Sequence, residues 1–327
     1  MCTAISFRTK DHYFGRNLDY ELSYGEQVAV TPRRVPFPFR KMTNMNEHYA
    51  MIGMATVVDN YPLYYEATNE KGLSIAGLLF AGNADYKPAV EGKDNITPFE
   101  LIPWLLGQCK NIKEVRGKLE KINLVNIPFS ERYPLSPLHW LMADREECIT
   151  VESVKEGLWV YDNPVGVLTN NPTFDMQMFE LNRYMALTTE EPKNTFSSEI
   201  GLETYSRGMG AIGLPGDLSS TSRFVKAVFT KMNSKCGESE SESVSQFFHL
   251  LGSVEQQRGC VHMGEGKYEI TLYSSCCNTD KGIYYYRTYE NSQITAVDMH
   301  KEDLDGDKVM TYPLITGQQI YWQNEGE

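Results

Sequence analysis

The chain begins with Met1, Cys2 and Thr3, and Cys2 is the residue whose position most strongly favours chemistry. An initiator methionine is generally removed when the second residue is small, and its removal leaves a thiol and a free α-amino group on one residue. Because an α-amino group has a pKa of about 8, part of it is neutral at cellular pH and accepts a proton without a histidine. N-terminal nucleophiles that attack carbonyl carbons use this combination. The sequence therefore predicts that Cys2 becomes a nucleophile once Met1 is removed.

Two charged residues follow one short turn later, in segment 14–19, which we expect to be a strand paired with residues 3–7. A cation close to a thiol lowers the thiol pKa, so Arg16 would favour the reactive thiolate. Asp19 would hold the α-amino group in place. The residues alone leave a second interpretation open, in which Cys2 is incidental and the two charges form a surface ion pair of little energetic value.

The composition narrows the class of partner. The 327 residues carry a formal net charge of -12, which disfavours nucleic acids and anionic membranes, so we expect a small-molecule substrate. No apolar run approaches the length of a membrane span and the N-terminus lacks the plan of a signal peptide, which predicts a cytoplasmic protein. The seven cysteines are scattered without a Cys-x-x-Cys pair, so we expect no disulfide framework, no metal site and no cofactor.

Three familiar motifs occur without the context that gives them a function. Residues 208–213 spell G-x-G-x-x-G, but no strand leads into them and a Pro-Gly pair follows where the helix should begin. Residues 72–76 resemble a serine elbow that ends in alanine, and residues 303–307 lack the terminal bidentate glutamate of a calcium loop. We assign no site to any of them.

The elements that must position Cys2 occur in blocks of strands and pairs of helices. We expect strands at residues 3–7, 13–17, 49–58, 72–80, 138–143, 148–153, 158–161, 166–168, 269–274, 283–289 and 294–299. We expect a helix that begins at a capping box at residues 97–100 and a second helix over 115–122. A third places residues 174, 178, 181 and 185 on one face, and two more cover 223–232 and 244–251. The acidic stretch 238–243 is interpreted as a solvated loop. This order predicts one α+β domain over residues 1–327, built as a layered sandwich.

Several segments, in order along nearly the whole chain, resemble the choloylglycine hydrolase family, which contains bile salt hydrolases and penicillin V acylases. The matching segments are residues 1–3, 14–19, 69–73, 168–175, 213–217, 222–224 and 284–290. The resemblance implies a four-layer αββα sandwich of the N-terminal nucleophile hydrolase superfamily and a homotetramer. It also implies that Cys2 is the nucleophile, Arg16 and Asp19 its flanking pair, Asn170 an oxyanion-hole amide and Arg223 a second arginine near the thiol.

One position departs from this family pattern. Where many bile salt hydrolases have Gly-Leu-Asn-Phe, this chain has residues 77–80 as Gly-Leu-Leu-Phe, so Leu79 offers only a backbone N–H to an oxyanion. The penicillin acylases of the family can carry tyrosine there, which keeps penicillin V acylase as an alternative to bile salt hydrolase. A second alternative is a non-enzymatic binding protein that retains Met1.

The segments that resemble the family's pocket loops predict an apolar and aromatic lining suited to a steroid acyl group. The residues concerned are Leu18, Val58, Tyr65, Phe129, Tyr133 and Leu138. Arg207 is expected to meet the carboxylate of glycine or the sulfonate of taurine, with a lean towards taurine conjugates.

Overall fold

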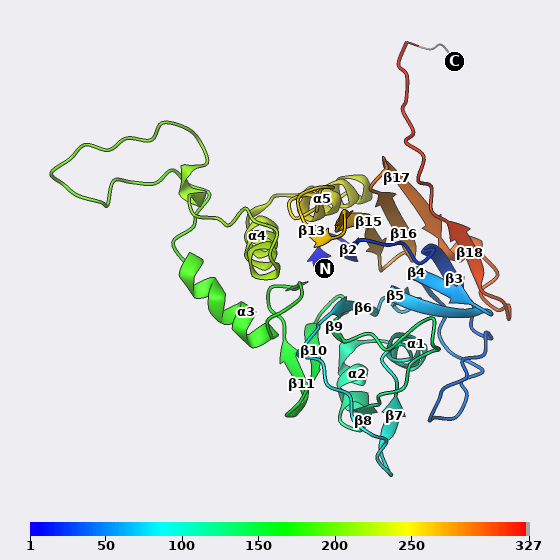
Figure 1. Ribbon diagram of the computed structural model, residues 1–327. Coiled ribbons are helices and arrows are strands. Elements are labelled where there is room, and N and C mark those ends of the chain that lie inside the picture. The colour runs from blue at the N-terminus through cyan, green and yellow to red at the C-terminus, as the bar shows by residue number, and fades with distance from the viewer. Residues whose placement is uncertain (325–327) are drawn as a thin grey trace.

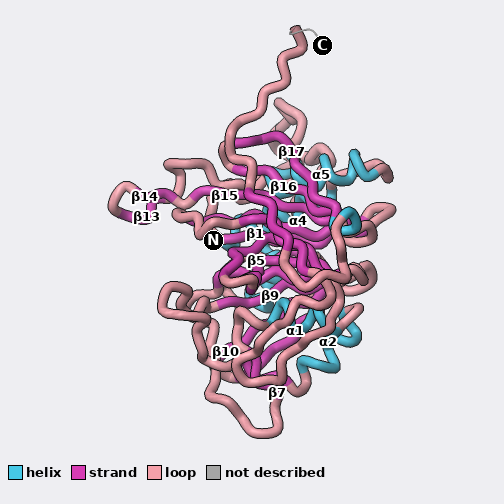
Figure 2. Tube along the Cα trace, turned by 90° about the vertical axis from the view of Figure 1, so that its right-hand side faces the viewer, coloured by secondary structure: helices cyan, strands magenta, loops and turns pink. Residues whose placement is uncertain are grey.

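Two antiparallel β-sheets packed face to face form the centre of the computed structural model, which describes residues 1–324. Helices cover both outer faces of this pair of sheets (Figure 1), so the predicted αββα sandwich is confirmed. Figure 2 shows the strands as two stacked layers with the helices outside them. The prediction of a single domain over residues 1–327 stays a prediction, and residues 325–327 lie outside the described part of the chain.

The first sheet has six strands and carries Cys2. Its order is β12 (Val167–Leu168), β1 (Cys2–Arg8), β2 (His12–Tyr20), β15 (Ile270–Asn278), β16 (Ile283–Thr288) and β17 (Asn291–Asp298). The predicted pairing of segment 14–19 with residues 3–7 is confirmed, and the β1–β2 hairpin places Cys2 opposite Leu18 and Ala4 opposite Arg16. Gly15 permits this register, because a Cβ there would overlap the carbonyl oxygen of Ser275 on the neighbouring strand.

The second sheet has eight strands and forms the opposite wall of the sandwich. Its order is β11 (Gly157–Asp162), β10 (Cys148–Val154), β9 (Leu138–Ala143), β6 (Ser74–Leu79), β5 (Tyr61–Asn69), β4 (Met51–Val58), β3 (Gln27–Thr31) and β18 (Met310–Pro313). Two small two-stranded sheets pair β7 (Asp94–Ile96) with β8 (Ile122–Leu124) and β13 (His262–Gly264) with β14 (Lys267–Tyr268). Strands β6 and β9 are neighbours in this sheet, and Leu79 and Leu138 at their paired ends line the same cavity as Cys2.

Apolar faces hold the helices against the sheets. Helices α4 (Ser220–Asn233) and α5 (Glu240–Gly252) pack on the first sheet, α1 (Leu101–Gln108) packs on the second, α2 (Ile112–Leu119) joins the same apolar cluster as α1, and α3 (Phe174–Glu180) packs against α4. One apolar cluster fills the space between the sheets and under α4 and α5. A second cluster fills the space between the eight-stranded sheet, α1 and α2. Burial of these faces, rather than helix propensity, stabilises such short helices.

Three predictions about helices need correction. The expected capping box at Thr97 forms only in part, because residues 97–100 make a turn and the helix begins at Leu101. Glu240 begins α5 rather than lying in a solvated loop, since Ser239 and Glu242 form a reciprocal capping box that the charge pattern concealed. Met185 does not share the buried face of α3, because the α-helix ends at Glu180 and the Met185 side chain is 84% exposed.

The prediction also missed strands β3, β5, β7, β8, β13, β14 and β18. Most of these are short or mix polar and apolar residues, and pairing with distant strands stabilises them. The missed strand β5 matters most here, because it lies between β4 and β6 in the wall that faces Cys2.

Candidate active site

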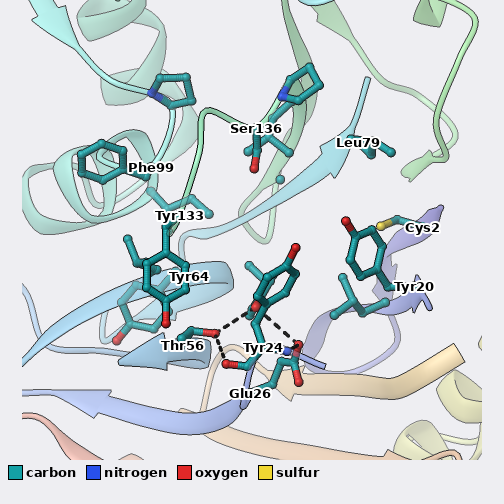
Figure 3. A pocket seen from close by; sticks show the side chains of 18 of the residues that line it. Cys2, Tyr20, Tyr24, Glu26, Thr56, Tyr64, Leu79, Phe99, Tyr133 and Ser136 are labelled. Atoms are coloured by element: carbon teal, nitrogen blue, oxygen red, sulfur yellow. Dashed lines mark hydrogen bonds between the residues drawn. The ribbon is translucent and has the colours of Figure 1, made fainter. Parts of the chain in front are cut away.

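Cys2 is the first residue of β1 and lines a cavity of about 360 Å³ between the two sheets. Its side chain is almost buried, at 4% exposure. Figure 3 shows Cys2 and Tyr20 together at one end of this cavity, with Phe99 and Tyr133 towards the other. A nucleophile in this position can attack a carbonyl group whose acyl part fills the cavity.

Asn170 and Arg223 hold the backbone at Cys2 from two further elements. The Cys2 backbone nitrogen donates to Asn170 Oδ1 at 2.7 Å. Arg223, on α4, donates from Nη1 to the Cys2 carbonyl oxygen at 2.6 Å and from Nη2 to Asn170 Oδ1 at 2.8 Å. Burial lowers the pKa of Arg223, while the nearby Asp19 and Cys2 oppose that shift. The structure therefore brings together Cys2, Asn170 and Arg223, which lie more than 50 residues apart from one another in the chain.

Arg16 and Asp19 lie on β2 beside Cys2 and are fully buried. Arg16 donates from Nη1 to the carbonyl oxygens of Gly77 at 2.5 Å and Tyr65 at 3.2 Å. Burial lowers the pKa of Arg16, but the nearby negative groups, Cys2 first among them, outweigh burial and raise it. Asp19 accepts from the Thr271 hydroxyl at 2.6 Å, and its second oxygen lies 3.7 Å from Arg223 Nη1. Two cations and one carboxylate thus surround the thiol.

Leu79 is the last residue of β6 and directs its backbone towards the same site. The Phe80 N–H donates to the Pro137 carbonyl, so the amide of Leu79, one residue earlier, points to the opposite edge of the strand. Pairing with β5 on that edge ends at Ala76, and the Leu79 carbonyl oxygen accepts from Asn170 Nδ2 at 2.7 Å. The Leu79 N–H therefore points to the same edge of β6 as the Leu79 carbonyl oxygen that Asn170 contacts.

Met1 covers Cys2 and also lines the cavity. Its carbonyl oxygen accepts from the Asp19 N–H at 3.0 Å, and its ammonium group donates to the Asp19 carbonyl oxygen at 2.6 Å and pairs with Glu269. Burial lowers the pKa of this ammonium group. While Met1 is present, the Cys2 nitrogen is a peptide nitrogen that cannot act as a base.

Most predicted pocket residues line the cavity, but two do not. Leu18, Tyr65, Phe129, Tyr133 and Leu138 all contribute to its wall. Val58 lies outside it, because Val58 pairs with Tyr61 next to the β4–β5 turn, beyond the end of the cavity where Thr56 takes part instead.

Arg207 also lies outside the cavity. It is exposed on the long connection between residues 185 and 219, which extends from the body of the chain in Figure 1. In an isolated chain, Arg207 therefore does not meet a substrate bound at Cys2.

The cavity wall includes a polar group that the sequence did not predict. Thr56 Oγ1 lies 2.9 Å from the Tyr65 hydroxyl, which donates to Glu26 Oε1 at 3.4 Å. Glu26 also accepts from the Tyr24 backbone N–H at 2.9 Å and from the Ser23 hydroxyl at 2.5 Å. Since these residues come from β4, β5 and the connection before β3, no local sequence pattern could have grouped them.

Within residues 1–324, no three His, Cys, Asp or Glu side chains cluster in a way that could hold a metal ion. None of the helices in the same range has the length and apolarity that a membrane crossing requires.

A thiol at the start of a central strand, inside two stacked antiparallel sheets covered by helices, defines the class of N-terminal nucleophile hydrolase folds. A family profile described as linear amide C–N hydrolases, choloylglycine hydrolase family, matches residues 2–312. The chain belongs to this family.

Individual relatives agree with this assignment. The chain is 61% identical over 324 residues to the bile salt hydrolase/transferase of Lactiplantibacillus plantarum, covering 99% of this chain and 100% of the relative. It is 40% identical over 319 residues to the bile salt hydrolase/transferase of Clostridium perfringens, covering 95% of this chain and 96% of the relative. A crystal structure of a mutant conjugated bile acid hydrolase from Clostridium perfringens superposes with a TM-score of 0.92 at 38% identity, covering 99% of this chain and all of that one.

The fold is also shared with a more distant structure. Penicillin V acylase from Agrobacterium tumefaciens superposes with a TM-score of 0.73 at 19% identity, covering 95% of this chain and 90% of that one. At this identity the likeness establishes the shared fold alone.

Proposed function

We propose that this chain is a bile salt hydrolase, which cleaves the amide bond between a bile acid and glycine or taurine. The observation that carries the proposal is Cys2 at one end of an apolar and aromatic cavity. Such a cavity suits a steroid acyl group, because apolar and aromatic walls bind apolar ligands and a few polar groups orient them. The relatives described above carry the corresponding activity in their names.

The proposed mechanism begins with removal of Met1, which frees the Cys2 α-amino group. Asn170 Oδ1, 2.7 Å from that nitrogen, orients it. The amine takes the thiol proton, and the thiolate attacks the amide carbonyl carbon to form a C–S bond. The resulting oxyanion accepts from the Leu79 N–H and from Asn170 Nδ2.

Collapse of this intermediate breaks the C–N bond, and the α-ammonium group gives its proton to the departing amine. Water then attacks the thioester carbonyl carbon while the α-amine accepts a water proton. Breaking the C–S bond releases the bile acid and restores the thiol. Arg16 and Arg223 stabilise the thiolate throughout because both are buried cations beside it.

The test is a side-by-side assay of taurocholate, glycocholate and penicillin V, together with the intact mass of the protein. We expect turnover of the two conjugated bile salts and a mass that lacks Met1. Turnover of penicillin V alone would contradict the bile salt assignment. Leu79 is the observation that keeps penicillin V acylase as the second candidate, since it replaces the asparagine common among bile salt hydrolases.

The remaining alternative is a binding protein that retains Met1. In that case the ammonium group of Met1 keeps its partner Glu269 and Cys2 has no free amine. A mass that includes Met1, with binding of bile salts but no turnover, would favour this alternative over the hydrolase.

We also propose that the protein is a cytoplasmic homotetramer, in which Arg207 meets the carboxylate of glycine or the sulfonate of taurine in the pocket of another copy. Support comes from large apolar side chains exposed on and next to the connection that carries Arg207. These are Met185, Phe196, Ile200, Leu202, Tyr205 and Ile212. Exposed apolar surface of this kind is typical of a protein interface. Native mass spectrometry tests the stoichiometry, and the taurocholate to glycocholate ratio of Arg207→Ala tests the role of the arginine.

A further inference from the structure

A buried carboxylate lies between the two sheets directly behind the proposed active site. Glu66, on β5 of the eight-stranded sheet, is 2% exposed. Its Oε1 accepts from Ser275 Oγ at 2.9 Å and from the Tyr284 hydroxyl at 2.5 Å, and its Oε2 accepts from the Tyr273 hydroxyl at 2.8 Å. These three donors belong to β15 and β16 of the six-stranded sheet, so the carboxylate joins the two sheets.

The fourth group at this carboxylate is Arg16. Arg16 Nε lies 3.9 Å from Glu66 Oε2, and Arg16 Nη1 donates to the carbonyl oxygens of Gly77 and Tyr65. Arg16 Nη2 is buried and has no hydrogen-bond partner among residues 1–324, while Arg16 itself lines the cavity at Cys2. Arg16 Nε donates to the Asn17 carbonyl oxygen at 3.4 Å, and Glu66 forms an ion pair with the same edge of the guanidinium group, which leaves Nη2 as a donor for the thiolate or the substrate.

Glu66 is one of the charged groups around Cys2, so it affects the charge near the thiol as well as the contact between the sheets. The cations near the thiol are Arg16, Arg223 and the N-terminal amine, and the carboxylates that face these cations are Asp19, Glu66 and Glu269. Tyr273, Tyr284 and the buried Cys277 are the other titratable groups next to Arg16 and Glu66. Burial raises the pKa of Glu66, while Arg16 and the three hydroxyl donors oppose that shift because they stabilise the ionised form.

We propose that Glu66 is a positioning residue, which holds Arg16 against Cys2 with Nη2 free and offsets part of the positive charge that the thiol experiences. The proposal rests on the proposed function of Cys2 as nucleophile. Without the Glu66 charge, Arg16 and Arg223 would stabilise the thiolate more strongly. Arg16 would also lose the carboxylate that pairs with its Nε.

The test replaces Glu66 with glutamine, which keeps the size of the side chain and removes its charge. Two quantities are measured against pH: kcat/KM with taurocholate, and the rate at which neutral iodoacetamide alkylates Cys2, followed on the Cys2 peptide by mass spectrometry. We expect Glu66→Gln to move the acid limb of both curves to lower pH by about one unit, because a nearby negative charge that opposed the thiolate is gone. We also expect kcat to fall about tenfold, since loss of an orienting contact misplaces Arg16.

A matched control replaces Glu70 with glutamine. Glu70 follows the same strand and pairs with Arg33 at 2.6 Å, but neither residue lines the cavity. Glu70→Gln is expected to leave both pH curves in place. A folded Glu66→Gln protein whose Cys2 alkylation curve coincides with that of the unsubstituted protein would overturn the proposal.

A second variant keeps the proposal testable if Glu66→Gln does not fold. Glu66→Asp retains the charge and withdraws it from Arg16, so we expect kcat/KM to fall severalfold without the shift of the alkylation curve to lower pH that Glu66→Gln produces. Full kcat/KM in this variant would overturn the positioning role. Alkylation needs no assumption about the substrate, so failure of the proposed function, seen as no turnover of any of the three substrates, is distinct from failure of this proposal.

Discussion

Asn170 is the residue at which the structure makes its strongest quantitative prediction. In the folded chain its Oδ1 accepts from the Cys2 nitrogen at 2.7 Å and from Arg223 Nη2 at 2.8 Å, and its Nδ2 donates to the Leu79 carbonyl oxygen at 2.7 Å. Asn170→Ala removes all three bonds and one proposed oxyanion donor together. Asn170→Asp removes the donor but keeps the acceptor for Cys2 and Arg223.

The two variants differ in the energies that they lose. Loss of one oxyanion donor costs about 100- to 1,000-fold in kcat, or about 2.7–4 kcal/mol of transition-state stabilisation. Loss of three buried hydrogen bonds costs about 1 kcal/mol each, while Arg223 keeps its bond to the Cys2 carbonyl oxygen. We therefore expect both variants to lose at least about 100-fold in kcat, and Asn170→Ala alone to lose several kcal/mol of unfolding free energy as well.

The assay is steady-state release of glycine from glycocholate and taurine from taurocholate, with active sites counted by alkylation of Cys2 at saturating iodoacetamide. Urea unfolding gives the free energy of unfolding in parallel. Asn171→Ala is the matched control, because its amide donates to the Ala81 carbonyl oxygen at 2.6 Å on an exposed turn. We expect that control to keep kcat within about twofold, in line with a surface substitution.

The result that would refute the reasoning is a folded Asn170→Ala protein with more than one tenth of the original kcat. Such a protein would show that the Leu79 N–H, or a donor outside this group, carries the oxyanion by itself. A loss in Asn170→Ala with none in Asn170→Asp would assign Asn170 to holding Cys2 and Arg223 rather than to the oxyanion.

Three further predictions concern the cavity and the core. Leu79→Asn adds a side-chain donor where bile salt hydrolases commonly have one, so we expect kcat with glycocholate to rise relative to kcat with penicillin V; an unchanged ratio would show that this side chain does not select the substrate. Tyr65→Phe removes the hydroxyl that contacts Thr56 and Glu26 in the cavity wall, so KM for glycocholate, which has three ring hydroxyls, should rise more than KM for a conjugate with one; equal changes would contradict a hydroxyl-reading role. Burial lowers the pKa of His12 to about 4, so between pH 6.5 and 4 the unfolded chain binds a proton at His12 that the folded chain does not. The free energy of unfolding therefore decreases as the pH falls from 6.5 to 4. His12→Gln should flatten this slope in urea unfolding at pH 7 and pH 4.5, and an unchanged slope would contradict the assignment.

Local patterns in the sequence determined the first half of the site. Residues 2–20 form a hairpin with a short turn, so the predicted pairing of its two strands brought Arg16 and Asp19 near Cys2, while the structure supplied the register that places Cys2 opposite Leu18. Resemblance to the family supplied Asn170 and Arg223, which no pattern of spacing links to Cys2. Where the prediction failed, local hydrogen bonds moved the helix start: the Glu100 N–H donates to the Thr97 carbonyl oxygen in a turn before α1, and Ser239 and Glu242 form the capping box of α5.

Tertiary structure alone decided what surrounds the thiol. Whether Thr56 or Val58 lines the cavity depends on where the β4–β5 hairpin ends relative to the cavity, and the placement of Glu66 against Arg16 depends on how the two sheets stack. Such contacts join residues from different sheets, so their energies depend on three-dimensional packing and leave no periodic trace in the chain. The sequence by itself therefore predicted the nucleophile and its hairpin, and the stacking of two sheets determined the cavity and the charges that face it.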